Sequence, residues 1–513
     1  MRKRYVKLLI LIATLQSIAW GLPASIDRFI AKSGIPKKDI SIYIKETKSD
    51  RVVASLYADR SRTPASVIKV LTTYAAITKL GFNWRWSTKV YTTGKLRRGT
   101  LYGDLLIKGY GDPTLKTTAL KSIVSHIKKR GIKQINGNIV IDRSYFSVGN
   151  KNNSGFDNNR YSAYNAMPDA MMFNERISTV NINPKKNLVY KRLKDDSYKL
   201  NNKLKRVNRP CKGKYSYPSL SINHRNHTTV MTIGGTISKR CGARSVSKVI
   251  TTPYKSFYYA LKDLLNRSGV KVNGRLKLAK IPSNAKLIYT HRSKKLEKIV
   301  SKTAKKSNNL YARHLLLLLG AKQYGAPATL AKGSKAVKRV LSNIGALPSA
   351  PLKIDNGCGL SRSAKLNAKV LARVCDSAYR RYGKRWMNTL SIAGVDGTIN
   401  KRFRGTVVKG RAWMKTGTLN RVKNITGYVK SKSGKLYTVV ILVNTNKPRW
   451  KASQLQNQII KWLVGYRPSR GVVEPKKPNI QKLYQKRIES SIEYSRPKDS
   501  FNPKDDIVEM PLF

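Results

Sequence analysis

The N-terminal third of the chain alternates between strand-like and helix-like hydrophobic patterns. Residues 38–58 hold two apolar runs around a polar turn, which predicts two paired strands. Residues 63–81 place alanine, leucine and isoleucine behind a proline, which predicts a buried helix with the proline in its first turn. Residues 86–109 alternate again between glycines that indicate turns. A helix at 117–131 and a strand at 139–142 follow.

The middle of the chain has a weaker pattern. Residues 149–228 are polar, rich in asparagine and poorly periodic, which indicates short strands and loops. A strand at 230–235 and a helix at 257–265 restore regular structure. We therefore interpret this block as an insertion between two parts of another domain.

The C-terminal half is more regular. Residues 295–320 are predicted to be largely helical, and five consecutive leucines at 315–319 would surround that helix, so it should be buried. A further helix is predicted at 327–344. The loop at 355–362 is followed by Ser363, which we expect to cap the next helix.

Three strands and a closing helix end this half. The strands are predicted at 411–418, 424–430 and 436–444, and Ser433-Gly434 marks the hairpin between the last two. We expect them to lie side by side and antiparallel. The closing helix should span 452–463.

The two ends of the chain have their own composition. Residues 1–19 combine a basic start, a short apolar run and small residues, which is typical of a secretory signal peptide. An uncleaved membrane anchor is the alternative. Residues 467–513 are rich in proline, lysine, serine and charge, so we expect a flexible polar tail.

Ser66 and Lys69 form the first candidate for chemistry. They are three residues apart on the helix predicted at 63–81, a spacing that puts both side chains on one face. A serine hydroxyl is a poor nucleophile until a base takes its proton, and a lysine in an apolar pocket can be that base. The S-x-x-K pattern occurs six times in this lysine-rich chain, so the pattern alone is weak.

Two later motifs strengthen this candidate. Ser307-Asn308-Asn309 lies at the start of the leucine-rich helix. Lys415-Thr416-Gly417-Thr418 lies on the first of the three C-terminal strands and contains the one K-T-G of the chain. S-x-x-K on a helix, S-x-N at a helix start and K-T-G on a strand, in this order, match the penicillin-recognising serine enzymes.

The chain resembles the class C low-molecular-mass penicillin-binding proteins, the D-alanyl-D-alanine carboxypeptidase/endopeptidase family typified by penicillin-binding protein 4. The resemblance covers roughly residues 30–465 and includes four further segments: G-D-P-T-L at 111–115, I-D-x-S-x-F at 141–146, G-x-G-L-S-R at 357–362 and A-G-V-D-G-T at 393–398.

The resemblance implies a fold and a division into domains. It implies an α/β (α+β) penicillin-binding-protein/β-lactamase-like transpeptidase domain with a large mixed insert between the first and second motifs. On this basis we expect a discontinuous catalytic domain at 20–90 and 290–466, with the inserted domain or domains at 91–289.

The resemblance also implies roles for individual residues. Ser66 would be the acylated nucleophile and Lys69 its base, and no cofactor or metal would be needed. Ser307 and Lys415 would relay a proton to the leaving amine, because an amine leaves only after protonation. Asn309 would bind an amide of the substrate, and Arg362 would bind a carboxylate of diaminopimelate. The terminal carboxylate would be bound by Thr416, Gly417 and Thr418. The backbone N–H of Thr418 would also stabilise the oxyanion. Ordinary strand threonines and a surface arginine are the alternatives for Thr416, Thr418 and Arg362.

The chain departs from the family pattern in two places. Its glycine-rich loop reads D-N-G-C-G instead of D-G-S-G, so Cys358 is expected near the site. Where relatives often have a W-N-D-M-like segment, this chain has Tyr164-Asn165-Ala166-Met167. An acidic contact to the free amine of the substrate is therefore expected to be missing here.

The cysteines and histidines leave several questions open. Cys211 with Cys241 and Cys358 with Cys375 are the local disulfide pairings, but sequence does not establish connectivity. His224 and His227 lie in a segment without nearby acids, so we interpret them as surface residues and not as metal ligands.

The charge is extreme. The chain has 103 Lys+Arg against 25 Asp+Glu, a formal net charge of +78. Such a field attracts anionic polymers, and an exported protein meets polymers of the cell envelope before it meets nucleic acid. We therefore expect anionic envelope polymers as candidate partners and no nucleic acid. A lysine-rich solvated surface without a partner is the alternative.

The function expected from the resemblance is a periplasmic serine D,D-carboxypeptidase/endopeptidase. It would act on peptidoglycan stem peptides and be acylated by β-lactam antibiotics. Two alternatives remain: a β-lactamase or esterase on the same scaffold, or an inactive basic protein that binds the wall or nucleic acid.

Overall fold

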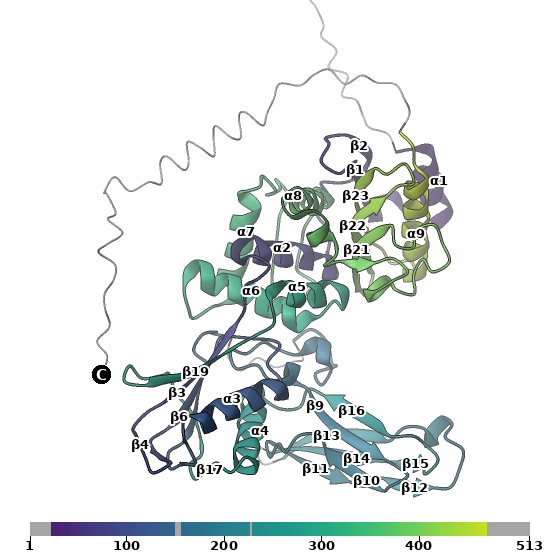
Figure 1. Cartoon of the computed structure of the whole chain (residues 1–513). Coiled ribbons are helices and arrows are strands. Elements are labelled where there is room, and N and C mark those ends of the chain that lie inside the picture. The colour runs from purple at the N-terminus through teal and green to yellow at the C-terminus, as the bar shows by residue number, and fades with distance from the viewer. Residues whose placement is uncertain (1–21, 149–154, 226–227, 469–513) are drawn as a thin grey trace, which may run out of the picture. The chain divides into compact units, whose positions relative to one another are not determined.

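A six-stranded antiparallel sheet unites the two ends of the described chain in this computed structural model, which describes residues 22–148, 155–225 and 228–468. The strand order is β2-β1-β23-β22-β21-β20 (Figure 1). The strands span β1 Ile40–Glu46, β2 Val52–Leu56, β20 Ser391–Ile392, β21 Ala412–Leu419, β22 Val422–Lys430 and β23 Leu436–Asn444. The N-terminal strand β1 therefore pairs with β23, almost four hundred residues later in the chain.

Helices cover both faces of this sheet. Val439, Ile441 and Val443 of β23 pack in one core with α1 (Ala24–Ser33) and α9 (Arg449–Gly465). Val440 and Leu442 point to the other face and share a second core with the helical layer. Because β23 is buried on both sides, its sequence is a nearly continuous apolar run. β22 is also buried along most of its length but includes the polar residues Asn424 and Thr426.

The helical layer carries two of the three motifs. It consists of α2 Lys69–Leu80, α5 Leu296–Lys305, α6 Asn309–Tyr324, α7 Leu330–Ser342 and α8 Ala368–Met387. All five leucines at 315–319 are buried, as predicted. The helix predicted at 295–320 is broken at Ser307, between α5 and α6.

The predicted helix cap at Ser363 is wrong. The side chain of Asn367 caps α8 instead, because its Oδ1 accepts from the backbone N–H of Val370 at 2.9 Å. Ser363 donates its hydroxyl to Asp355 at 2.6 Å and so closes the glycine-rich loop.

The insert begins with a pair of small sheets around two helices. One sheet has the order β18-β8-β6-β3-β19 and the other β17-β7-β5-β4. Helices α3 (Thr117–Lys129) and α4 (Pro253–Arg267) pack on them in a common core. The strands are β3 Ser87–Thr92, β4 Lys95–Arg97, β5 Thr100–Tyr102, β6 Leu105–Gly109, β7 Gln134–Ile135, β8 Ile139–Asp142, β17 Lys271–Val272, β18 Leu276–Leu278 and β19 Lys286–Arg292.

The outer part of the insert is built from short strands with a small core of its own. Three sheets, β10-β9-β16, β11-β14-β13 and β12-β15, enclose Val180, Ile182, Met231 and Ile233. The strands are β9 Ser178–Asn183, β10 Leu188–Lys191, β11 Tyr198–Asn202, β12 Lys205–Val207, β13 Ser219–Arg225, β14 Thr228–Gly234, β15 Thr236–Ser238 and β16 Arg244–Lys248. Strands β10 and β11 of this part are mostly exposed or half-buried, so few of their positions need an apolar residue and the periodicity is weak.

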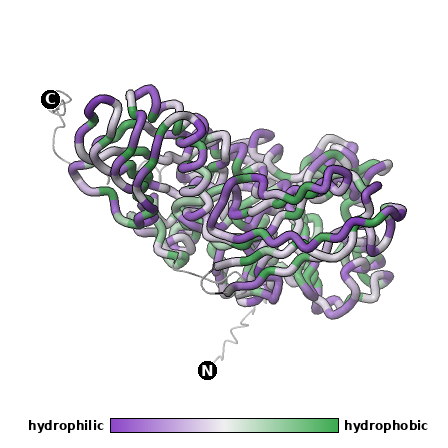
Figure 2. The backbone as a smooth tube through the Cα atoms, turned by 90° about the horizontal axis from the view of Figure 1, so that it is seen from below, coloured by the Kyte–Doolittle hydropathy of each residue, from purple (hydrophilic) through white to green (hydrophobic). Residues whose placement is uncertain are grey.

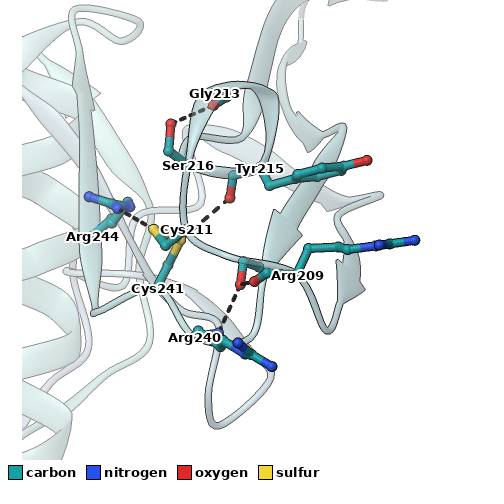
Figure 3. Close-up of a disulfide and its surroundings, with 9 residues drawn as sticks. Arg209, Cys211, Gly213, Tyr215, Ser216, Arg240, Cys241 and Arg244 are labelled. Carbon is teal, nitrogen blue, oxygen red and sulfur yellow. Dashed lines mark hydrogen bonds between the residues drawn. A yellow bond between two sulfur atoms is a disulfide. The ribbon is translucent and has the colours of Figure 1, made fainter.

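One disulfide connects the segments that follow β12 and β15 in this outer part. Cys211 and Cys241 are bonded, and Arg209, Arg240 and Arg244 lie around them (Figure 3). Cys358 and Cys375 are both buried and free, so the second local pairing is not formed. His224 is exposed, whereas His227 lies outside the described residues.

The division into a catalytic domain and an insert stays a prediction. The expected limits at 90 and 290 fall inside β3 and β19, which pair with each other in the insert sheet. The backbone N–H of Trp86, just before β3, donates to the hydroxyl of Ser293, just after β19, at 2.9 Å. The expected signal peptide at 1–19 lies outside the described residues, as does nearly all of the expected tail at 467–513.

Hydrophobic residues gather along the inner parts of strands and helices, and hydrophilic residues dominate the outer loops (Figure 2). Across the residues that the structure describes, no helix is both long and apolar enough to cross a membrane.

Candidate active site

Ser66 lies in a tight turn directly before α2. A 3₁₀ turn, Ala65–Ile68, precedes the α-helix, and Ala65 adopts the left-handed conformation at φ 49°. Gly359 packs closely against this turn, and only glycine fits there, because a Cβ at position 359 would stand 1.9 Å from the carbonyl oxygen of Ala65. The predicted helix thus starts with a strained turn that turns Ser66 toward the glycine-rich loop.

Lys69 contacts Ser66 as the spacing predicted. Its Nζ lies 2.8 Å from Ser66 Oγ. The same nitrogen lies 2.7 Å from Asn309 Oδ1 and 2.5 Å from the carbonyl oxygen of Cys358. A neutral amine has two hydrogens and one lone pair. Asn309 and Cys358 can accept the two hydrogens, which leaves the lone pair for the proton of Ser66.

Burial makes the uncharged form of Lys69 available near neutral pH. Its side chain is fully buried, and this burial lowers its pKa to about 8. The charge of nearby Arg313 acts in the same direction, whereas the Cys358 side chain opposes it. At neutral pH a useful fraction of Lys69 is therefore uncharged.

Ser307 and Lys415 form a second serine–lysine pair. Lys415 Nζ donates to Ser307 Oγ at 3.0 Å and to the carbonyl of Thr416 at 2.7 Å. Burial, followed by the charge of Lys69, lowers the pKa of Lys415 well below its usual value. Ser307 has a left-handed backbone at φ 52°, in the break between α5 and α6. The K-T-G strand and the S-N-N helix start therefore meet at one point.

The K-T-G strand packs against the turn that holds Ser66. A Cβ on Gly417 would stand 2.8 Å from the carbonyl oxygen of Pro64 and 3.0 Å from the backbone nitrogen of Ser66. Only glycine allows this approach, which brings the backbone of Thr418 toward that of Ser66.

Asn424 is a site residue that the motifs did not reveal. It lies on β22 and donates through Nδ2 to the carbonyls of Thr63 and Pro64, each at 2.9 Å. Its Oδ1 accepts from the backbone N–H of Val443 at 2.9 Å. No motif in the sequence marks it, because β22 also contains other polar residues.

The remaining predicted residues differ in their surroundings. Thr416 Oγ1 lies 2.9 Å from Thr398 Oγ1, which comes from the A-G-V-D-G-T segment. Thr418 is exposed and accepts from Lys423 at 3.3 Å. Arg362 is exposed at a 270 Å³ cavity beyond the end of β21, with its guanidinium 5.3 Å from the ring centre of Phe156. The catalytic groups and Arg362 share no hydrogen bond in the described part of the chain.

The insert reaches the site through the Y-N-A-M segment. Asn309 Nδ2 donates to the carbonyl of Tyr164 at 3.0 Å. The Tyr164 hydroxyl and the Asn165 amide in turn donate to Asp157, at 2.8 Å and 2.7 Å. The segment itself has no acid, but Asp157 supplies one beside it.

The chemistry of this site is that of a serine nucleophile with amine bases. Its polar groups are hydroxyls, amines and amides. No cluster of His, Cys, Asp or Glu that could hold a metal ion occurs among the residues for which the structure gives positions.

The rate of acylation of Ser66 should depend on pH through Lys69. Only the neutral amine accepts the proton, so below its pKa of about 8 the rate should fall about tenfold per pH unit. Above that pKa the rate should level off. The measurement is the rate of acylation by benzylpenicillin across pH. A rate that stays constant as the pH falls through this region would contradict the assignment of Lys69.

Comparison with known proteins found a family model and relatives that match most of the chain. The family model described as D-Ala-D-Ala carboxypeptidase 3 (S13) matches residues 22–465. The D-alanyl-D-alanine carboxypeptidase DacB of Haemophilus influenzae is 26% identical over 453 residues, which cover 84% of this chain and 91% of that protein.

Solved structures show the same fold. The crystal structure of penicillin binding protein 4 (dacB) from Haemophilus influenzae aligns with a TM-score of 0.74 and 24% identity, covering 86% of this chain and 99% of that one. The structure of that protein complexed with a novel β-lactam aligns with a TM-score of 0.70 and 23% identity, covering 86% and 100%. The fold expected from the resemblance is confirmed.

Proposed function

We propose a function for this chain from one premise: the chain belongs to the D-Ala-D-Ala carboxypeptidase 3 (S13) family. It is a serine-type D,D-carboxypeptidase/endopeptidase whose substrate is the stem peptide of peptidoglycan. Terminal D-Ala-D-Ala bonds are its carboxypeptidase substrates, and D-Ala-diaminopimelate crosslinks are its endopeptidase substrates. β-Lactam antibiotics acylate the same serine.

The observation that carries this proposal is the pair of buried lysines, each bonded to a serine. Lys69 lies 2.8 Å from Ser66 Oγ, and Lys415 lies 3.0 Å from Ser307 Oγ. Acyl transfer needs one group to take a proton from the nucleophile and another to give one to the leaving amine. The two pairs supply these two functions at one site.

Acylation follows from these contacts. Lys69 takes the proton of Ser66 as Oγ attacks the carbonyl carbon between the two D-alanines. The backbone N–H groups of Ser66 and Thr418 stabilise the oxyanion, and each such donor is typically worth about 2.7–4 kcal/mol. Ser307 passes a proton from Lys415 to the departing amine, and D-alanine leaves.

Deacylation and substrate binding use the same groups. A water molecule attacks the acyl-enzyme, and Ser307 passes the proton of this water to Lys415, which gave up a proton during acylation. Ser66 recovers its own proton from Lys69 as the acyl group leaves. Lys415, Thr416 and Thr418 bind the terminal carboxylate, with Gly417 allowing the approach. The second hydrogen on Asn309 Nδ2 is directed to the substrate amide, because Tyr164 accepts the first. Arg362 binds a carboxylate of a longer or crosslinked substrate.

The site of action is proposed to be the periplasm. The N-terminal pattern of residues 1–19 favours export. The Cys211–Cys241 disulfide fits an oxidising compartment. There the charge of +78 favours contact with anionic envelope polymers.

The test is release of D-alanine from a peptide that ends in D-Ala-D-Ala, with a peptide ending in L-Ala-L-Ala as the control substrate. The wild type should release D-alanine from the first peptide alone, and Ser66→Ala should release none. Rapid hydrolysis of benzylpenicillin without peptide cleavage would instead establish a β-lactamase. Absence of both activities would establish a binding protein.

A further inference from the structure

The insert contains a cavity that no part of the mechanism uses. Its volume is about 480 Å³, and it is formed at the start of α3, along β9 and beside the start of α4. Phe173, Leu193 and Tyr198 provide apolar wall, and serine and threonine hydroxyls provide polar wall. This size and mixed lining are typical of sites for small ligands. We call it the insert cavity.

Two arginines at the insert cavity have no acidic partner. Arg176 is mostly buried, which lowers its pKa, and it donates to the carbonyls of Thr251 and Met167 at 3.1 Å and 3.4 Å. Arg192 makes only long contacts of 3.4 Å, to Asn181 and Ser245. Neither forms a salt bridge with any acid that the structure describes.

The acids at the insert cavity are already engaged. Asp195 accepts from the hydroxyls of Ser197 and Ser256, each at 2.5 Å. Glu175 pairs with Lys302 at 2.6 Å and Lys116 at 3.2 Å. Neither guanidinium group is therefore paired with these acids, although the charge of Asp169 acts on Arg176 and Arg192 is exposed to solvent. Carboxylates and phosphates are the groups that such planar donors bind well.

Glu175 links the insert cavity to the second motif. Besides Lys302, its carboxylate accepts from the Tyr311 hydroxyl at 3.1 Å and from Asn308 Nδ2 at 3.3 Å. Asn308 caps α6 through the N–H of Tyr311 at 3.0 Å. It is also the residue between Ser307 and Asn309. Glu175, which lines the insert cavity, thus contacts the central residue of the S-N-N motif directly.

The segment Asn174–Arg176, which lines the insert cavity and which we call the floor segment, has a strained backbone. Asn174, Glu175 and Arg176 are three successive non-glycine residues in the left-handed region, with φ of 46°, 55° and 62°. Such a conformation is energetically unfavourable for residues with a side chain and persists only where the surroundings hold it. Here the contacts of Glu175 to α5 and α6 hold the segment in this conformation. A ligand bound to the neighbouring Arg176 can therefore change how stable this conformation is.

We propose that the insert cavity binds a second stem peptide of peptidoglycan through a carboxylate, and that its occupancy adjusts the S-N-N motif through Glu175. This inference rests on the proposed function for the identity of the ligand. A wall polymer displays many stem peptides, so a chain held at one site meets a second peptide at high effective concentration. Because binding at two coupled sites is reciprocal, a peptide in the cavity would favour binding of a second peptide at Ser66 on a dense polymer.

The first test measures binding of a stem tetrapeptide, the reaction product, to the full-length Ser66→Ala protein by calorimetry. Two sites are expected. Arg192→Gln should weaken one of them at least about tenfold. The matched control is Arg209→Gln, the same change at an exposed insert residue that does not line the cavity. A single site, or equal effects of both variants, would overturn the proposal.

Two further ligands identify the chemistry. A tetrapeptide with all carboxylates amidated should lose the Arg192-dependent site. Inorganic phosphate should not compete for that site at equal concentration. Competition by phosphate would overturn the assignment to a peptide and would indicate a phosphate polymer.

The second test measures the coupling. Tetrapeptide at saturating concentration should change the rate of acylation of the wild type by benzylpenicillin about fivefold, a typical allosteric factor. Glu175→Gln should abolish this change. The control is Glu297→Gln. Glu297 lies on α5 and forms a salt bridge with Arg385 of α8, away from the cavity lining, so this variant should retain the peptide effect. An equal peptide effect in the Glu175 variant, or none in the wild type, would refute the coupling.

Failure of this inference is distinguishable from failure of the proposed function. If the proposed function is wrong, no variant releases D-alanine. If the inference alone is wrong, the wild type and the Arg192 and Glu175 variants all release D-alanine, but peptide binding and acylation rates show no dependence on Arg192 or Glu175.

Discussion

Replacing Lys69 by methionine is expected to lower the rate of acylation of Ser66 by about 10³-fold, within the range of 10²–10⁴ typical for loss of a general base. Lys69 is the amine within hydrogen-bond distance of Ser66 Oγ, at 2.8 Å. Methionine fills a similar buried volume without a polar group, so the fold should be retained. The measurement is the second-order rate of acylation by benzylpenicillin, and kcat/KM for the D-Ala-D-Ala peptide.

The matched control is Lys79→Met, on the same helix but exposed. It should leave both rates unchanged. Ser66 and Lys69 act as a unit, so the double variant Ser66→Ala/Lys69→Met should be no less active than Ser66→Ala alone. A Lys69→Met enzyme that retains more than about a tenth of the wild-type rate would show that another group is the base.

Replacing Gly417 by alanine is expected to lower kcat/KM by about 10²–10³-fold, the usual effect of losing one oxyanion-hole donor. The added Cβ would stand 2.8 Å from the Pro64 carbonyl and 3.0 Å from the backbone nitrogens of Ser66 and Val67. All three are backbone atoms of a packed turn, so β21 must move away from them. That movement separates the N–H groups of Ser66 and Thr418, which must converge on one oxygen atom.

Gly242→Ala is the control for the chemical change itself, because no atom lies within 4 Å of its Cβ position. It should leave kcat/KM unaltered. Thermal unfolding distinguishes a local effect from loss of fold: Gly417→Ala should still unfold cooperatively. Unchanged acylation kinetics in Gly417→Ala would contradict the proposed role of this contact.

The motifs could be found in the sequence because each has a local signature. Ser66 and Lys69 are neighbours on one helix, and Lys415 lies on a strand whose apolar pattern is strong. The last three strands of the sheet were recognisable for the same reason, most clearly β23, which is apolar along nearly its whole length. The pairing of β1 with β23, which completes the sheet, was not predicted. At these positions the element predicted from the local sequence pattern is the one that the packing of the folded chain stabilises.

Other site contacts have no local signature. The carbonyl of Cys358 bonds to Lys69, but a backbone group cannot be read from a residue type. The Cys358 thiol, which the sequence singled out, contacts Asn356 instead. Tyr164 and Asn309 are 145 residues apart, and Glu175 and Asn308 are 133 apart. Pairing at such separation depends on how the insert packs on α6.

The errors at element boundaries also have physical causes. Ser363 was expected to cap α8 because serine is a common N-cap, but Asp355 accepts its hydroxyl and Asn367 takes the position. The limits at 90 and 290 were placed within strands because the alternating pattern of residues 86–109 does not show which sheet the first strand joins.

The most direct test of the account is the intact mass of the mature protein after exposure to benzylpenicillin, beside that of Ser66→Ala. The account predicts one stoichiometric, slowly released adduct on the wild type and none on the variant. An adduct of equal yield on Ser66→Ala, or no adduct on a folded wild type, would contradict Ser66 as the acylated nucleophile.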